Sequence, residues 1–279
     1  CPLGLDVMDA AEAVIRVANA KMAGAIRLVS IERGLDPAAF TAMPFGGGGA
    51  LHTGALIQEV GVARALVPCY PGVVSALGCV VADMRHDAVK TVNRTLEDLD
   101  VTALAADIER LGGEGRASLT RADVAFTGVE QTVELDMLYV GQTHTITARL
   151  EGAAPGVDAI RAAFEAAYRA AFGRLLDGVP MKVMNLRVAV IGRRPKFDLA
   201  AMAPKTGGTV EDCITARRRI YAGGAWHDAA VIDRLKLPVG ARIAGPAVLE
   251  QADTTIFVDP GLVGRVDAFG NLIMERAGE

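Results

Sequence analysis

The chain has 279 residues, of which 51% are hydrophobic and 22% are charged, and its formal net charge at pH 7 is -4. This composition is typical of a globular protein with one large or two ordinary domains, and it excludes a protein that binds nucleic acid through bulk positive charge. No apolar run reaches the roughly 18 residues of a membrane span, and no basic segment is followed by an apolar one, as in a signal peptide.

Four cysteines and four histidines limit the metal and redox chemistry of the chain. Cys1, Cys69, Cys79 and Cys213 share no C-x-x-C spacing, and no two histidines lie three to five residues apart. The pattern predicts reduced thiols in a cytoplasmic protein, with Cys69 and Cys79 buried as small hydrophobic residues, and it predicts no zinc site.

The first third of the chain alternates helices and short strands. Apolar residues at helical spacing predict a long helix over residues 9–34, begun by Asp6 or Asp9 and ended by Gly34. We expect a helical turn at 36–40, a strand at 41–45, a helix at 51–60, a strand at 63–68 and a helix at 72–83. This alternation indicates a parallel α/β layer.

The remainder of the chain is richer in strands. We expect strands at 86–96, 124–136, 138–150 and 181–194, helices at 100–119 and 157–176, and several short strands after residue 207. We therefore predict two domains, an α/β domain over residues 1–92 and a β-rich α+β domain over residues 93–279.

Four consecutive glycines, Gly46, Gly47, Gly48 and Gly49, separate a strand from a helix. Without β-carbons the backbone can adopt positive φ and approach a ligand, and the N–H groups at the start of a helix carry partial positive charge. The spacing matches neither a Walker A loop nor a G-x-G-x-x-G fingerprint. From these residues alone, a nucleotide contact and a tight turn without a ligand are equally supported.

Several motifs in a fixed order are similar to those of the hydantoinase A/5-oxoprolinase family, which includes the ATP-binding subunits of acetone and acetophenone carboxylases. They are Asn19 with Met22, Ala25-Ile26-Arg27, and the segments at residues 30–34, 45–52, 71–78 and 82–87. Downstream segments also resemble the C-terminal domain of that family, so the resemblance covers nearly the whole chain. One departure is Ala50, where the family usually has proline.

The resemblance implies the second lobe of an ATPase core of the acetate kinase/sugar kinase/Hsc70/actin type, followed by the β-rich domain. It assigns Gly46, Gly47, Gly48 and Gly49 to the adenosine side of ATP. Asn19 and Arg27, on the preceding helix, are expected to face the same cleft, and Asn19 and His52 are added to the glycines as candidate nucleotide contacts. A structural role is favoured for His52, and an ion pair with Asp83 or Glu32 is favoured for Arg27.

The same resemblance implies an enzyme that uses ATP to phosphorylate a poorly reactive oxygen. That oxygen is a carbonyl oxygen in cyclic amide hydrolysis, and an enol or bicarbonate oxygen in ketone carboxylation. The first phosphate loop, the catalytic acid and the ligands of Mg²⁺ are expected on another chain, since this chain resembles the downstream half of a subunit. The expected partners are the upstream half of the hydantoinase A-type subunit and a hydantoinase B-type subunit.

The principal hypothesis is a component of an ATP-dependent cyclic amide hydrolase. The alternatives are the same role in a ketone carboxylase, or a non-catalytic structural subunit whose glycine turn is empty. Two further clusters have structural interpretations. Asp83, Arg85, His86 and Asp87 favour a polar network between domains over an acid/base site, and residues 250–254 indicate a loop that faces a partner.

Overall fold

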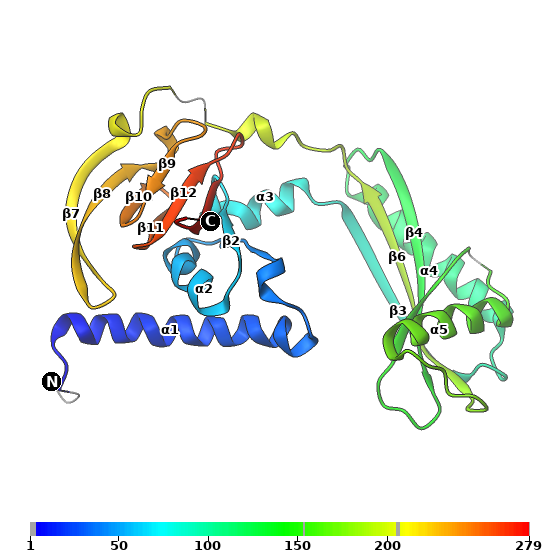
Figure 1. Ribbon diagram of the computed structural model, residues 1–279. Helices are drawn as coiled ribbons and strands as arrows, with labels where there is room; N and C mark the ends of the chain where they lie inside the picture. Colours follow the sequence, from blue (N-terminus) through cyan, green and yellow to red (C-terminus); the bar gives the residue numbers. More distant parts are fainter. Residues whose placement is uncertain (1–3, 153, 205–206, 279) are drawn as a thin grey trace. The chain divides into compact units, whose positions relative to one another are not determined.

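The computed structural model describes residues 4–152, 154–204 and 207–278, which belong to two compact units (Figure 1). The first unit combines residues up to Val80 with those from Phe197 onward, and the second unit spans Val81–Lys196. The expected domains, residues 1–92 and 93–279, are divided differently because the end of the chain returns to the first unit. That sequence-based boundary stays a prediction.

The helices of the first unit begin and end close to where the sequence predicts. Helix α1 spans Val7–Val29, and the carboxylate of Asp6 accepts a hydrogen bond from the N–H of Asp9 at 2.8 Å, as an N-cap does. A 3-10 turn continues it to Gly34, whose φ of 74° ends the helical path. Helices α2 (Thr53–Val60) and α3 (Val74–Val81) follow.

Two mixed sheets complete the first unit. Strand β1 (Thr41–Ala42) pairs in parallel with β2 (Arg64–Val67), as expected of an α/β layer. The same sheet continues with strands from the end of the chain, in the order β1-β2-β13-β12-β9. These are β9 (Arg242–Ala244), β12 (Leu262–Val266) and β13 (Leu272–Arg276). The parallel layer is therefore limited to one strand pair within a mixed sheet.

The second sheet of this unit has the order β11-β10-β8-β7. It consists of β7 (Ile214–Ala222), β8 (Ala225–Asp233), β10 (Ala247–Gln251) and β11 (Thr254–Val258). The hairpin of β7 and β8 contacts α1 (Figure 1), where the hydroxyl of Tyr221 donates to Asp9 at 2.8 Å and the N–H of Gly223 donates to Glu12 at 2.5 Å. Trp226 is a residue of β8.

A single apolar core joins the early helices to the late strands of the first unit. Ile57 of α2, Val67 of β2, Leu249 of β10 and Met274 of β13 belong to one cluster, and each is fully buried. Because burial of such side chains contributes about 1.5–3 kcal/mol each, the C-terminal strands stabilise the early elements directly.

The second unit is an antiparallel sheet with two helices. Its strands lie in the order β3-β6-β4-β5, and α4 packs on β3 and β6 while α5 packs on β5. The bounds are β3 (Met84–Thr95), α4 (Val101–Arg121), β4 (Gly128–Tyr139), β5 (Ile146–Leu150), α5 (Val157–Phe172) and β6 (Met181–Arg193). Helix α5 buries Ile160, Phe164 and Tyr168 along one face, whereas Phe172 near its end is 54% exposed.

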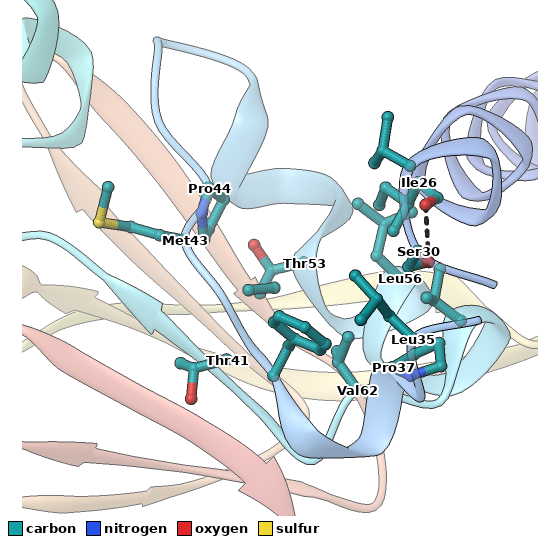
Figure 2. A pocket seen from close by; sticks show the side chains of 14 residues that line it. Ile26, Ser30, Leu35, Pro37, Thr41, Met43, Pro44, Thr53, Leu56 and Val62 are labelled. Atoms are coloured by element: carbon teal, nitrogen blue, oxygen red, sulfur yellow. Dashed lines mark hydrogen bonds between the residues drawn. The ribbon is translucent and has the colours of Figure 1, made fainter. Parts of the chain in front are cut away.

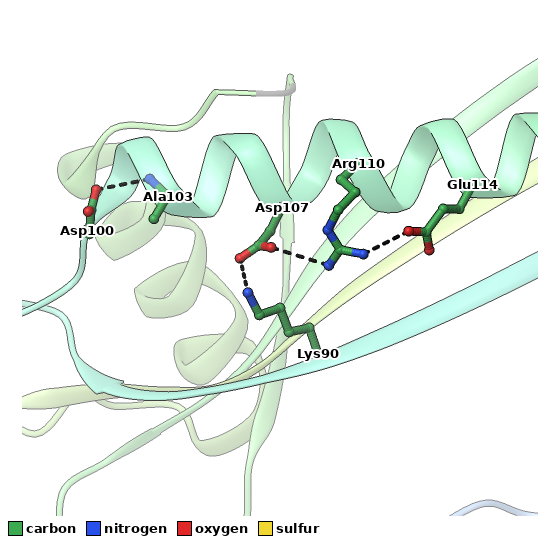
Figure 3. Close-up of polar contacts among 6 residues, drawn as sticks. All are labelled: Lys90, Asp100, Ala103, Asp107, Arg110 and Glu114. Atoms are coloured by element: carbon green, nitrogen blue, oxygen red, sulfur yellow. Dashed lines mark hydrogen bonds and ion pairs between the residues drawn. The ribbon is translucent and has the colours of Figure 1, made fainter.

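Helix α4 begins at a side-chain cap and carries ion pairs on its surface (Figure 3). The carboxylate of Asp100 accepts from the N–H groups of Thr102 and Ala103 at 2.9 and 3.0 Å. Lys90 of β3 contacts Asp107 at 2.5 Å. Such exposed pairs stabilise a fold by less than about 1 kcal/mol each, so the apolar contacts hold α4 in place.

The expectations about the cysteines have different outcomes. Cys69 is buried as predicted. The prediction that Cys79 is buried is wrong: Cys79 lies on α3, a short apolar helix that has no buried residue, and it is exposed. Cys1 lies outside the described residues. Within the described ranges, no helix combines the length and apolar character needed to cross a lipid bilayer.

Candidate functional site

The glycine turn joins β1 to the helical segment of α2. The N–H of Gly46 donates to the carbonyl oxygen of Pro71 at 2.7 Å, and Gly46 has a φ of 85°, which a residue with a β-carbon rarely adopts. Gly47, Gly48 and Gly49 have no positive φ. The conformational need for glycine in this turn is therefore concentrated at Gly46.

The backbone of the turn is accessible at its centre. Gly47 and Gly48 are exposed, and a β-carbon at Gly48 would meet no atom within 4 Å. Among the described hydrogen bonds, none uses the N–H of Gly47 or Gly48 as a donor. Because a 3-10 turn begins at Gly49, these two amides lie at the positive end of a short helical segment.

A second turn, at Pro71 and Gly72, lies beside the glycine turn because both follow the parallel strands β1 and β2. Gly72 donates its N–H to the Asp253 carboxylate at 2.8 Å. A β-carbon at Gly72 would clash with the backbone carbonyl of Asp253, so this close approach requires glycine. The two turns thus form one edge, as expected at the carboxyl ends of parallel strands.

The loop between β10 and β11 fixes both turns. The hydroxyl of Thr254 donates to the carbonyl of Gly47 at 3.0 Å, and the amide of Gln251 donates to the carbonyl of Cys69 at 3.2 Å. Gln251 also bonds the carboxylate of Asp253. Residues 250–254 were expected to face a partner, but three of them contact the turns of their own unit.

Arg234 anchors this arrangement from the interior. Its guanidinium donates to the carbonyl oxygens of Cys69 at 2.6 Å and Gly270 at 3.2 Å, and to the side chain of Gln251 at 3.0 Å. Burial lowers the pKa of Arg234, which is 4% exposed. An arginine stays charged even so, and its planar fork of donors satisfies several carbonyls at once.

The side chains of Asn19 and His52 form a hydrogen bond with each other. The Nδ1 of His52 lies 2.7 Å from the Oδ1 of Asn19, and Asn19 is buried. Since an amide oxygen only accepts, His52 donates through Nδ1 and its ring is fixed to α1. This pair holds α1 against the helical segment after the glycine turn, and a nucleotide contact for either residue stays a prediction.

The remaining candidate residues have structural partners. Arg27 donates to the carbonyl oxygen of Glu59 at 2.5 Å, instead of forming the expected ion pair with Asp83 or Glu32. Asp83 accepts from the guanidinium of Arg193 at 2.6 Å within the second unit.

The cluster at residues 83–87 is a set of surface ion pairs. Arg85 bonds Asp87 at 2.8 Å, and hydrogen bonds from Arg194 and Arg193 lower the pKa of Asp83. Gly115 of α4 lies so near His86 that an added β-carbon would be 3.4 Å from its ring. His86 therefore packs under a helix, and the ion pairs of the cluster lie within the second unit, so a polar network between the domains stays a prediction. Nowhere in the described ranges do three His, Cys, Asp or Glu side chains gather as metal ligands.

Comparisons with known proteins cover nearly the whole chain. The hydantoinase/oxoprolinase family profile matches residues 1–88, and the profile of the hydantoinase/oxoprolinase C-terminal domain matches residues 88–276. An uncharacterized protein of Methanocaldococcus jannaschii is 31% identical over 98% of this chain and 39% of its own length. The caprolactamase subunit alpha of Pseudomonas jessenii is 30% identical over 93% of this chain and 38% of its own length.

A solved structure has a similar fold. The nucleotide-free acetone carboxylase superposes with a TM-score of 0.78 and 24% identity, over 99% of this chain and 41% of that one. The chain therefore spans about two fifths of the length of these proteins.

Proposed function

Because this chain belongs to the hydantoinase/oxoprolinase family, we propose that it is one component of an ATP-dependent cyclic amide hydrolase. In this proposal the backbone of Gly46, Gly47, Gly48 and Gly49 contacts the adenosine side of ATP. Asn19 and His52 support the helical segment that follows the turn.

The observation that carries the proposal is that the glycine turn is held in place by hydrogen bonds and is exposed at its centre. The N–H of Gly46 is held by the carbonyl of Pro71 and the carbonyl of Gly47 by the hydroxyl of Thr254, while the N–H groups of the exposed residues Gly47 and Gly48 have no acceptor among the described hydrogen bonds. A turn held this firmly loses little conformational entropy when a ligand binds. Exposed amides without protein acceptors offer donors to a polar ligand.

The proposed reaction is activation of a carbonyl oxygen by phosphorylation. When bound, ATP supplies the phosphoryl group that makes a stable amide carbon susceptible to attack. The residues of this chain would orient the nucleoside and exclude water from its face. The phosphate loop, the catalytic acid and the ligands of Mg²⁺ would come from the preceding part of the family protein, since phosphoryl transfer needs these groups.

The finer fold assignment belongs to the same proposal. Residues 1–92 would form the second lobe of an acetate kinase/sugar kinase/Hsc70/actin-type core, and residues 93–279 the C-terminal domain of the family. The partners would be the upstream half of the hydantoinase A-type subunit and a hydantoinase B-type subunit, in the cytoplasm. The matched caprolactamase chain is named as a subunit alpha, and this supports a multi-subunit assembly.

Calorimetric titration of the intact assembly with ADP tests the nucleotide contact. A Gly47→Val variant should bind ADP at least about tenfold more weakly, because two methyl groups would occupy the face that the nucleoside needs. Gly128→Val is the matched control, since Gly128 lies at a strand end with no atom near an added β-carbon. Equal affinities for the two variants would contradict the proposal and favour a structural subunit with an empty turn.

A ketone carboxylase is the second candidate function. Acetone carboxylase and caprolactamase share this part of the fold, with TM-scores of 0.78 and 0.72 to this chain, so the fold is compatible with both candidates. ADP release by the intact assembly distinguishes the two. Stimulation by a lactam or hydantoin alone supports the hydrolase, and stimulation that requires both a ketone and bicarbonate supports the carboxylase.

A further inference from the structure

Helix α1 has an apolar face that no other described element of the first unit covers. Of its 23 residues, only Asn19 and Ala23 are buried. Six apolar residues recur at spacings of three, four or seven on the opposite side, and the helical repeat places them on one face. We call Val7, Ala11, Val14, Ala18, Ala25 and Leu28, with neighbouring Val17, the outer stripe.

The valines and leucine of the outer stripe are strongly exposed. The exposed fractions are 82% for Val7, 69% for Val14, 59% for Val17 and 55% for Leu28. Only Lys21 brings a charge to this face. Burial of apolar surface is favoured by about 25 cal/mol per Å², and a contiguous exposed apolar face marks a site of contact with another protein surface.

An apolar groove lies at the C-terminal end of the same helix (Figure 2). It has a volume of about 390 Å³ and is bounded by the end of α1, residues 35–44 and α2. Val29, Leu35, Phe40 and Met43 line it, and no charged side chain does. Val29 follows Ala25 by one helical turn, so the groove continues the outer stripe.

The strand beside the groove, β1, also has one edge that pairs with no other described strand. Strand β1 is an edge strand that pairs only with β2 among the described strands. Of the 25 large hydrophobic residues that are exposed in the described chain, 13 fall between Leu5 and Leu51. The exposed apolar side chains and the unpaired strand edge of the first unit are thus concentrated around α1 and β1.

We infer that the outer stripe and the groove dock the part of the family protein that lies outside the region matched by this chain. This chain spans 39% and 38% of two relatives that it matches over nearly its full length, so about three fifths of each relative lies elsewhere. Stable protein–protein contacts have an apolar core, and the outer stripe and the groove offer such a surface. The inference rests on the proposed multi-part assembly but not on the nucleotide contact.

Photo-cross-linking in the intact assembly identifies what covers this surface. A photoreactive amino acid replaces Val17 in one sample and Val239 in the other, since both valines are 59% exposed and belong to the first unit. We expect position 17 to cross-link to sequence outside residues 1–279, with a yield at least about tenfold above position 239.

Other cross-linking results overturn the inference. A cross-link from position 17 to residues 1–279 of a second copy would show a homodimer. A yield no higher than that of position 239 would show that the outer stripe faces solvent. Neither result depends on ATP, so both are distinct from a failure of the ADP titration.

A charge placed on the stripe gives a second measurement. Val14→Asp should weaken the association of this part with the rest of the assembly about tenfold, because the carboxylate would be buried in an apolar contact. Val239→Asp should leave the association unchanged. Equal effects of the two variants would contradict the inference.

Discussion

The hydroxyl of Thr254 donates a hydrogen bond to the carbonyl oxygen of Gly47, with 3.0 Å between the two oxygens, although 207 residues separate them in the chain. Thr254 opens strand β11 and is buried. The conformation of the glycine turn is therefore fixed by a segment from the end of the sequence, and not by the local sequence alone.

Thr254→Val removes this hydrogen bond and preserves the side-chain shape. We expect the free energy of unfolding to fall by about 1 kcal/mol and the affinity for ADP to fall several-fold, because the turn would lose its fixed geometry. The matched control is Thr215→Val, which removes a 3.2 Å hydroxyl bond to the carbonyl of Val231 away from the turn. The control should lose stability alone. A similar loss of ADP affinity in both variants would contradict the positioning role of Thr254.

Arg234→Met removes a buried donor that is shared by four backbone carbonyl oxygens. Because Arg234 serves the carbonyls of Val67, Pro68, Cys69 and Gly270, we expect a loss of about 3 kcal/mol in the free energy of unfolding, measured with urea. Arg218→Met is the control.

Arg218 is half exposed, and its one ion pair among the described residues is with Glu250 on the surface, so its replacement should cost less than about 1 kcal/mol. A loss for Arg234→Met as small as that of the control would show that water replaces the guanidinium.

Local patterns were sufficient to predict most of the elements. The Asp6 cap, the Gly34 stop and the strand–helix alternation up to residue 83 depend on neighbouring residues, and the structure confirms them. The family resemblance was likewise confirmed, because its motifs are contiguous segments.

Long-range contacts were not predictable in the same way. Arg234, Gln251 and Asp253 converge on the two turns only after the C-terminal strands return to the first sheet. No periodicity in the sequence encodes that return. The sequence shows only a polar segment, residues 250–254, between two apolar strands. Its polarity predicts a loop that faces a partner, and it gives no indication of the contacts with the two turns. The exposure of Cys79 was missed because an apolar helix normally indicates a core.

Asp136 and Arg187 form an asymmetric pair in the second unit. Burial alone would raise the pKa of Asp136, but hydrogen bonds from Arg187 and Asn185 outweigh it and hold that pKa below its usual value. The side chain of Asp136 is 4% exposed and that of Arg187 is 46% exposed. Removal of the arginine therefore leaves a buried carboxylate, whereas removal of the carboxylate leaves a cation that water can solvate.

Arg187→Met should accordingly cost more stability than Asp136→Asn, by about 1–2 kcal/mol in urea unfolding at pH 7. Since the folded-state pKa of Asp136 is lowered, its contribution is present above the unfolded value and is lost as the pH falls below about 4. In Asp136→Asn this part of the acid dependence should be absent. The reverse order of the two variants would show that the carboxylate is better solvated than its burial indicates.

The pKa of Asp259, in the first unit, is shifted in the opposite direction from that of Asp136. Burial raises its pKa to about 6, and its Oδ2 is buried without a hydrogen-bond partner among the described residues. Gly54 lies against this carboxylate so closely that no β-carbon fits there, so the side chain cannot turn toward water on that side. A folded-state pKa above the unfolded value means that the folded chain binds the proton more tightly. Stability is therefore highest below about pH 4 for this group and falls as the pH rises to about 6.

Asp259→Asn removes the buried charge and should raise the free energy of unfolding at pH 7.5 by about 2–3 kcal/mol, the value that a shift of about two pKa units implies. The gain should vanish when urea unfolding is repeated near pH 4, because the carboxyl is then neutral in both states. Asp228→Asn, at an exposed position of β8, should change neither value. If Asp259→Asn were no more stable than the parent chain at pH 7.5, the carboxylate would have to be solvated in the folded protein. In that case the contact with Gly54 would be looser than the structure shows.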